Sequence, residues 1–156
     1  MKRHIKTPFT LFTLVVLLAL STQNKSLAQT KVELPEGLEL GLRIGETQGS
    51  ALAIDAVFPF RGIRLRADIG FLDRFSVSAL HDWKFIINEN LFWYPGAGAV
   101  VDFEDGIDIG AVGEIGIEYL IQSTPISIAV DWRPTLNLTA GGFDETGFGI
   151  NLRYRF

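Results

Sequence analysis

The chain has 156 residues, with 14 basic against 18 acidic side chains and no cysteine. Without cysteine it can form neither a disulfide nor a thiolate metal site. The acidic balance also argues against nucleic-acid binding, which depends on basic contacts to phosphate.

The sequence opens with the three parts of a secretory signal. Basic residues within the first six positions precede an apolar run over 9–20, and Ser26-Leu27-Ala28 supplies the small residues of a cleavage site. The apolar run is too short to cross a bilayer as a helix, which takes about 20 residues. We therefore expect residues 1–28 to be a cleaved signal peptide.

After the signal we expect a short polar lead-in over 29–36 and a single domain over 37–156. Removing the signal takes away four of the 14 basic residues and no acidic one, which leaves 10 against 18. The mature chain is therefore clearly acidic.

Turn signals recur along the domain every 10 to 17 residues and separate segments of strand length. The eight expected strands cover 37–46, 50–58, 62–71, 75–86, 91–103, 107–119, 125–138 and 147–156. No helical period follows the signal. The pattern predicts an all-β domain.

Each expected strand alternates between an apolar and a charged face. The last one carries Phe148, Ile150, Leu152, Tyr154 and Phe156 on one side and Gly149, Asn151, Arg153 and Arg155 on the other. Sixteen charged residues share the polar face: Glu39, Arg43, Asp55, Arg64, Arg66, Asp68, Asp82, Lys84, Asp102, Asp108, Glu114, Glu118, Asp131, Arg133, Arg153 and Arg155. Glycines are interspersed among them.

Two arrangements fit this alternation. In a water-soluble barrel the apolar face lines the interior, whereas in a membrane barrel it faces lipid and the charges line the lumen. The secretory signal, the aromatic C-terminus and the glycines of the charged face favour the second arrangement. We therefore predict an eight-stranded antiparallel up-and-down transmembrane β-barrel in the bacterial outer membrane.

The aromatic residues cluster near the expected strand ends, as in the two girdles of membrane barrels. One expected girdle contains Phe58, Phe60, Phe85, Trp93, Tyr119, Tyr154 and Phe156. The opposite girdle contains Phe71, Phe75, Phe103 and Phe148.

The segment from Ile126 to Pro134, the glycine-rich loop after it and the strand from Phe148 to Phe156 resemble the last hairpin of small outer-membrane barrels from Bacteroidota-type bacteria. The wider architecture resembles the OmpA/OmpX-type eight-stranded superfamily. The resemblance implies that both termini lie in the periplasm. It also implies that the barrel-assembly machinery reads the terminal strand that ends at Phe156.

No group of residues predicts catalysis, and we assign no catalytic, cofactor-binding or metal-binding residue. His81 is the only histidine after the signal, and in a strand it points away from Asp82, so the two cannot form a base and its orienting acid. Ser76 and Ser78 lie upstream of it, and we expect His81 on the outer face as a tolerated polar residue.

Two further features have structural interpretations. Pro95 and Pro134 interrupt strand patterns, and we expect kinks or bulges there. Glu104-Asp105 and Asp144-Glu145 form an acidic outer rim, for which solvated loops are favoured over a site for divalent cations that bridge lipopolysaccharide.

The predicted function is a structural or envelope-maintenance role for a monomeric membrane barrel that contacts outer-membrane lipids and lipopolysaccharide. One alternative is a narrow transport or lipid-handling barrel, although an eight-stranded interior is just filled by side chains. The other is a secreted soluble barrel that binds a ligand.

Overall fold

The computed structural model describes residues 37–47, 50–60, 63–103 and 106–156, all within one compact unit over 35–156. The expected signal and lead-in lie outside the described residues. Among the residues that are described, no helix is long and apolar enough to cross a membrane.

The described residues of this unit contain eleven strands. They are β1 (Glu39–Thr47), β2 (Ser50–Phe60), β3 (Ile63–Gly70), β4 (Ser76–Asp82), β5 (Phe85–Ile86), β6 (Leu91–Asp102), β7 (Asp108–Leu120), β8 (Ile126–Trp132), β9 (Thr135–Asn137), β10 (Phe143–Asp144) and β11 (Phe148–Arg155).

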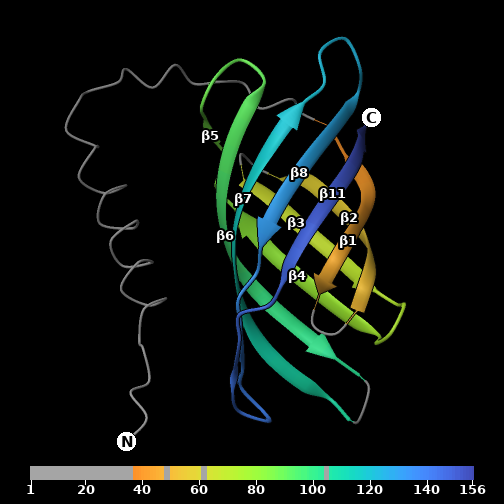
Figure 1. The fold of residues 1–156 in the computed structure, drawn as a ribbon, viewed down its shortest axis with the longest axis vertical. Coiled ribbons are helices and arrows are strands. Elements are labelled where there is room, and N and C mark those ends of the chain that lie inside the picture. The colour runs from red at the N-terminus through yellow and green to blue at the C-terminus, as the bar shows by residue number, and fades with distance from the viewer. Residues whose placement is uncertain (1–36, 48–49, 61–62, 104–105) are drawn as a thin grey trace, which may run out of the picture. The chain divides into compact units, whose positions relative to one another are not determined.

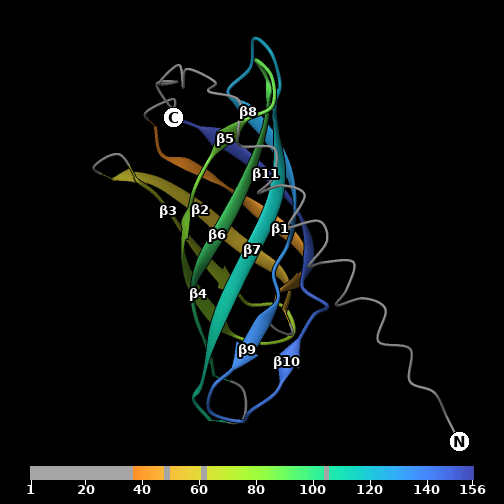
Figure 2. The same ribbon diagram turned by 90° about the vertical axis from the view of Figure 1, so that its left-hand side faces the viewer.

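Eight of the strands close into an antiparallel barrel in the order β1-β2-β3-β4-β6-β7-β8-β11 (Figures 1 and 2). Each pairs with the next long strand along the chain, and β11 pairs back onto β1 from Glu39↔Arg155 to Gly45↔Gly149. Closure leaves no long open edge, since every long strand has a partner on both sides. The predicted eight-stranded antiparallel barrel is confirmed.

β1 begins and β11 ends at one end of the barrel, which we call the termini end. It lies at the top of Figure 1. The opposite end, where the hairpins β1–β2, β3–β4 and β6–β7 turn, is the loop end. Short strands extend the wall at both ends. Near the termini end, β5 pairs with β6. At the loop end, β9 follows β8 in the chain and pairs with β7 on one side and with β10 on the other.

These short strands correct the predicted boundaries. The segment expected as one strand over 75–86 is divided into β4 and β5, and the segment over 125–138 is divided into β8 and β9. The expected loop after β9 contains β10.

Of the kinks or bulges expected at the two prolines, bulges are absent from the described strands, because the strand pairing is interrupted at both prolines without a change of register. Trp83 N donates to Pro95 O at 2.9 Å, and Gly113 N donates to Pro134 O at 2.9 Å. Proline has no N–H to return the second bond of such a pair. At Pro95 the break falls in the neighbouring strand, between β4 and β5, while β6 itself continues.

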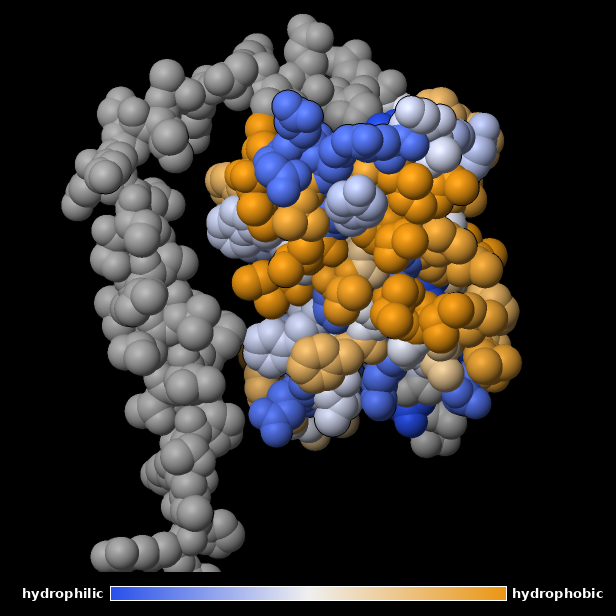
Figure 3. Space-filling view, turned by 45° about the horizontal axis from the view of Figure 1, so that its top comes forward, coloured by the Kyte–Doolittle hydropathy of each residue, from blue (hydrophilic) through white to orange (hydrophobic). Residues whose placement is uncertain are grey.

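The two faces of the barrel wall differ sharply in chemistry. Charged side chains point inward and are buried, as at Arg43 and Asp55, which are both 0 % exposed. Apolar side chains point outward, as at Leu42 and Ile44, which are 47 % and 62 % exposed. Figure 3 shows the outward residues as a hydrophobic band below a hydrophilic rim.

The expected lumen charges lie where the alternation predicted. Twelve are buried, and the Lys84 side chain is buried as well. Asp102, Asp108 and Arg155 are partly exposed near the two ends.

Exposed and half-buried aromatic side chains form neighbouring pairs at both ends. At the termini end Phe85 stacks on Trp93 with ring centroids 4.8 Å apart, and Tyr154 meets Phe156 at 4.9 Å. At the loop end the ring centroids of Phe75 and Phe103 are 5.5 Å apart, and those of Trp132 and Phe148 are 6.1 Å apart. The expected aromatic residues therefore face outward near the strand ends.

Candidate functional site

The barrel interior is the most densely charged part of the described structure, and glycines make room for it. A Cβ at Gly149 would lie 2.4 Å from Cζ of Arg43. A Cβ at Gly116 would lie 2.3 Å from Cζ of Tyr94. Large side chains on one strand thus lie over glycines on the next.

Arg66 on β3 contacts four carboxylates across the lumen. Its Nη2 lies 3.1 Å from Asp82 Oδ2, and its Nη1 pairs with Glu114 and lies 3.5 Å from Asp131 Oδ2. Its Nε is 3.7 Å from Asp55 Oδ1. β3 and β8 are four strands apart in the eight-strand ring, so Arg66 and Asp131 bridge opposite walls.

Asp131 on β8 is held by several donors. Arg43 donates to Oδ1 from Nε at 3.1 Å and from Nη2 at 2.7 Å, and Asn151 Nδ2 donates to Oδ2 at 2.6 Å. Its neighbour Arg133 donates to Asp68 at 2.9 Å and to Glu114 at 2.8 Å. We call these residues, together with Arg153, the central cluster: Arg43, Asp55, Arg66, Asp68, Asp82, Glu114, Asp131, Arg133 and Arg153.

A second group of charged side chains lies in the lumen nearer the termini end. We call it the terminal cluster: Glu39, Arg64, Lys84, Glu118 and Arg155. Glu118 accepts hydrogen bonds from Arg64 Nη2 at 2.6 Å, from Lys84 Nζ and from Arg153 Nη1 at 3.3 Å. Glu39 lies 3.4 Å from Arg64 and 3.6 Å from Arg155. Arg153 joins the two clusters, because it also donates to Asp55.

Two interior aromatics, Tyr94 and Phe92, were missed by the sequence analysis. The Tyr94 ring is fully buried, with Cζ of Arg66 4.8 Å and Cζ of Arg64 5.5 Å from its centroid. Lys84 Nζ lies 4.3 Å from the Phe92 centroid. Strand alternation could have revealed them, because Phe92 and Tyr94 lie on the same face of β6 as Asp102. Their aromatic character instead suggested the outer face.

The described part of the interior therefore holds buried charged side chains, most of them paired, and aromatic rings. Burying charge is costly unless it is paired and hydrogen-bonded, and the two clusters meet that condition for most of their members. This arrangement ties opposite walls together.

The histidine and serines considered in the sequence lie apart from one another. His81 points outward against Trp83, with ring centroids 4.4 Å apart, while Asp82 points inward. Ser76 and Ser78 are buried in the lumen, and Ser78 donates to Asp68 at 3.2 Å. The structure thus brings no histidine together with a serine and a carboxylate in these strands.

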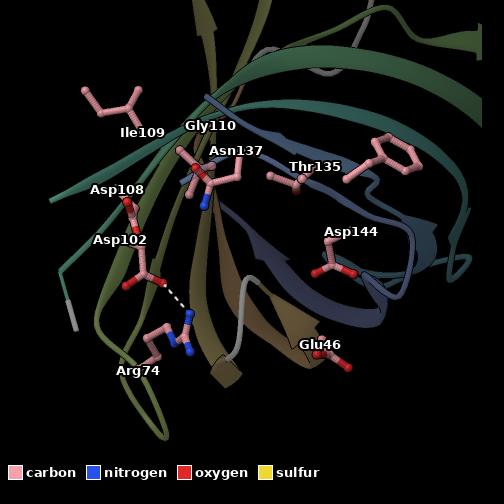
Figure 4. Close-up of a pocket in the computed structure, with 13 residues that line it drawn as sticks. Glu46, Arg74, Asp102, Asp108, Ile109, Gly110, Thr135, Asn137 and Asp144 are labelled. Atoms are coloured by element: carbon pink, nitrogen blue, oxygen red, sulfur yellow. Dashed lines mark hydrogen bonds and ion pairs between the residues drawn. The ribbon is translucent and has the colours of Figure 1, made fainter. Parts of the chain in front are cut away.

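A cup of about 420 Å³ opens at the loop end (Figure 4). Its walls come from β6, β7, β9 and β10 and include Asp102, Asp108 and Asp144. Arg74 Nη1 lies 3.5 Å from Asp102, and the Thr139 hydroxyl donates to Asp108 at 2.7 Å. Hydrophobic and polar side chains are mixed in the lining.

The expected acidic rim is only partly visible here. Asp144 lines the cup, Glu145 is exposed, and Glu104-Asp105 lies outside the described residues. Within the described ranges no three histidine or carboxylate side chains are arranged to hold a metal ion.

Comparisons of the chain with protein-family models, with curated proteins and with solved structures find no match. Its function is therefore inferred from its own residues and geometry.

Proposed function

We propose that this protein is an integral barrel of the bacterial outer membrane, where it has a structural or envelope-maintenance role without catalysis. One observation carries the proposal: the barrel is apolar outside and charged inside. A barrel in water needs the reverse arrangement, because its interior must be the apolar core.

The outward face supports this assignment along its whole length. Exposed leucine, isoleucine, valine and phenylalanine side chains cover the wall from β1 to β11. In water, a continuous apolar surface of this kind promotes aggregation, whereas in hydrocarbon it is the expected surface. Closure of the barrel also satisfies the backbone groups that lipid cannot hydrate.

The aromatic pairs at the two ends fit the two membrane–water interfaces, where aromatic rings are enriched. Since β1 begins and β11 ends at the same end of the barrel, both ends of the barrel domain are on one side, and we place that side in the periplasm. We further propose that the chain belongs with the small outer-membrane barrels that its last hairpin resembles. Its partners would then be outer-membrane lipid, lipopolysaccharide and the assembly machinery that reads the strand ending at Phe156.

The filled interior supports a structural role over transport. The central and terminal clusters connect facing strands at two levels of the lumen, and Tyr94 lies between them. A solute would have to displace several ion pairs at once to pass.

The lipid-facing assignment is tested at Leu42, an outward residue on β1. Leu42→Arg should abolish folding into the outer membrane, because a charge on the lipid face costs roughly 2 to 4 kcal/mol at mid-bilayer. Leu42→Ala is the matched control, since it removes the leucine without adding charge. Cell fractionation and heat-modifiable gel mobility measure the outcome. Normal membrane assembly of Leu42→Arg would contradict the proposal.

The physiological role needs a separate test. A deletion strain should leak periplasmic enzymes or become sensitive to detergent, and wild-type protein should restore the barrier. An unchanged envelope under these stresses would argue against the structural role and leave the membrane assignment intact.

A further inference from the structure

Asp82 and Glu114 face each other across Gly96 in the barrel interior. The three residues are direct partners in one row, with Asp82 on β4 paired to Gly96 on β6 and Gly96 paired to Glu114 on β7. An ideal Cβ on Gly96 would lie 2.6 Å from Asp82 Oδ1 and 3.2 Å from Glu114 Oε2. Both oxygens therefore converge on the space that the glycine leaves open.

Neither converging oxygen has a hydrogen-bond donor among the described residues. Both side chains are fully buried. The other oxygen of Glu114 accepts hydrogen bonds from Arg66 and Arg133. Asp82 is the least satisfied carboxylate of the central cluster, because neither of its oxygens accepts a hydrogen bond, although Arg66 Nη2 lies 3.1 Å from Oδ2.

Two ionised carboxylates in this position would repel each other, and each would have an unpaired oxygen in the buried interior. Buried acceptors without donors are costly, and two carboxylates that share a site resist ionising together. The central cluster also contains five carboxylates and only four guanidinium groups, even when Arg153 is included. One additional positive charge would balance the cluster.

We propose that the Asp82–Glu114 pair binds one proton, held over Gly96, so that one of the two carboxyls is neutral in the folded barrel at neutral pH. This proton site goes beyond the structural role proposed above and does not depend on the membrane assignment. A proton fits better than a metal ion, because no three-ligand group is present in the described ranges.

Several charged or titratable groups face the pair from the strands around it. They are Arg66 and Asp68 on β3, Asp55 on β2, Tyr94 on β6, Asp131 on β8, and Arg133 just after β8. The arginines favour ionised carboxylates, whereas the three neighbouring aspartates favour retention of the proton. Asp131 accepts hydrogen bonds from Arg43 and Asn151. Asp55 and Asp68 each lack a donor on one oxygen only, whereas Asp82 lacks a donor on both and faces the unpaired oxygen of Glu114, so the proton is assigned to the Asp82–Glu114 pair.

Infrared spectroscopy of the folded protein and of its variants tests the proposal. At neutral pH the wild-type spectrum should contain a protonated-carboxyl C=O band that shifts in D₂O. Glu114→Gln or Asp82→Asn should remove the band, since the amide then supplies the missing donor. Asp131→Asn is the control from the same cluster, and it should keep the band while lowering stability.

Stability against pH gives a second readout with a defined sign. Free carboxyls are ionised at pH 7, so folding would take up one proton and the free energy of unfolding should fall as pH rises. The contribution is about tenfold in the unfolding equilibrium constant per pH unit until the pair releases its proton. Glu114→Gln should remove this slope relative to wild type.

Absence of the band in wild type would overturn the proposal. So would a band that persists in both Glu114→Gln and Asp82→Asn. A band removed instead by Asp68→Asn would also overturn it, because the proton would then belong to Asp55 and Asp68, which are direct partners between β2 and β3.

Discussion

The ring of Tyr94 occupies the space that a side chain at position 116 would need. The two positions are direct partners between β6 and β7, and a Cβ on Gly116 would lie 2.3 Å from Tyr94 Cζ. Because Tyr94 is fully buried beside Arg64 and Arg66, its ring has no free space to move into. The glycine is thus a packing requirement of the filled interior.

Gly116→Ala should therefore destabilise the barrel by about 1 to 3 kcal/mol, as expected for overpacking. Gly113→Ala is the matched control on the same strand, because its Cβ would first meet Pro134 Cγ at an ordinary 3.6 Å. The control should stay within about 0.5 kcal/mol of wild type. Urea unfolding of the refolded protein measures both, and equal midpoints would contradict the packing argument.

Arg66→Met should be far more damaging, since it leaves Asp55, Asp82, Glu114 and Asp131 without a shared cation. Removing one partner of a buried ion pair typically costs about 3 to 5 kcal/mol. Arg74→Met is the control: that side chain is 42 % exposed beside Asp102, and such pairs contribute about 1 kcal/mol or less. The same unfolding assay compares them, and similar losses would show that the central cluster does not stabilise the barrel.

Purified protein in planar bilayers should show no steady large conductance. An eight-stranded barrel is just filled by side chains, and here Arg66 and Asp131 meet from opposite walls. Voltage-independent open currents, reproduced across preparations, would favour the transport alternative.

Phe156 should be needed for assembly at the termini end. Its N–H donates to Leu38 O at 2.9 Å, and its ring meets Tyr154, so it secures the closing pair β11–β1. Deleting Phe156 or replacing it with Asp should reduce the folded protein in the outer membrane at matched synthesis. Phe156→Tyr keeps the ring and should assemble normally. Full assembly of the deletion would remove the proposed role of the terminal aromatic.

Much of the fold was predictable because strand alternation is a local property. The side chains from Phe148 to Phe156 alternate between two chemistries, and each turn signal ends a segment, so the eight strands and their two faces follow from neighbouring residues. The position of Arg43 on the charged face and of His81 on the apolar face follows in the same way. The break opposite Pro95 does not, because it depends on which strand becomes the neighbour of β6.

The sequence by itself determined the eight strands of the barrel wall, the apolar and charged faces, and the residues available to each face. Only the tertiary structure decided that the charged face is inside, that Tyr94 lies on Gly116, and that Asp82 and Glu114 converge over Gly96. The physical reason is that a face is defined by alternation along one strand, whereas contact across a lumen depends on closure and on the register between strands far apart in the chain.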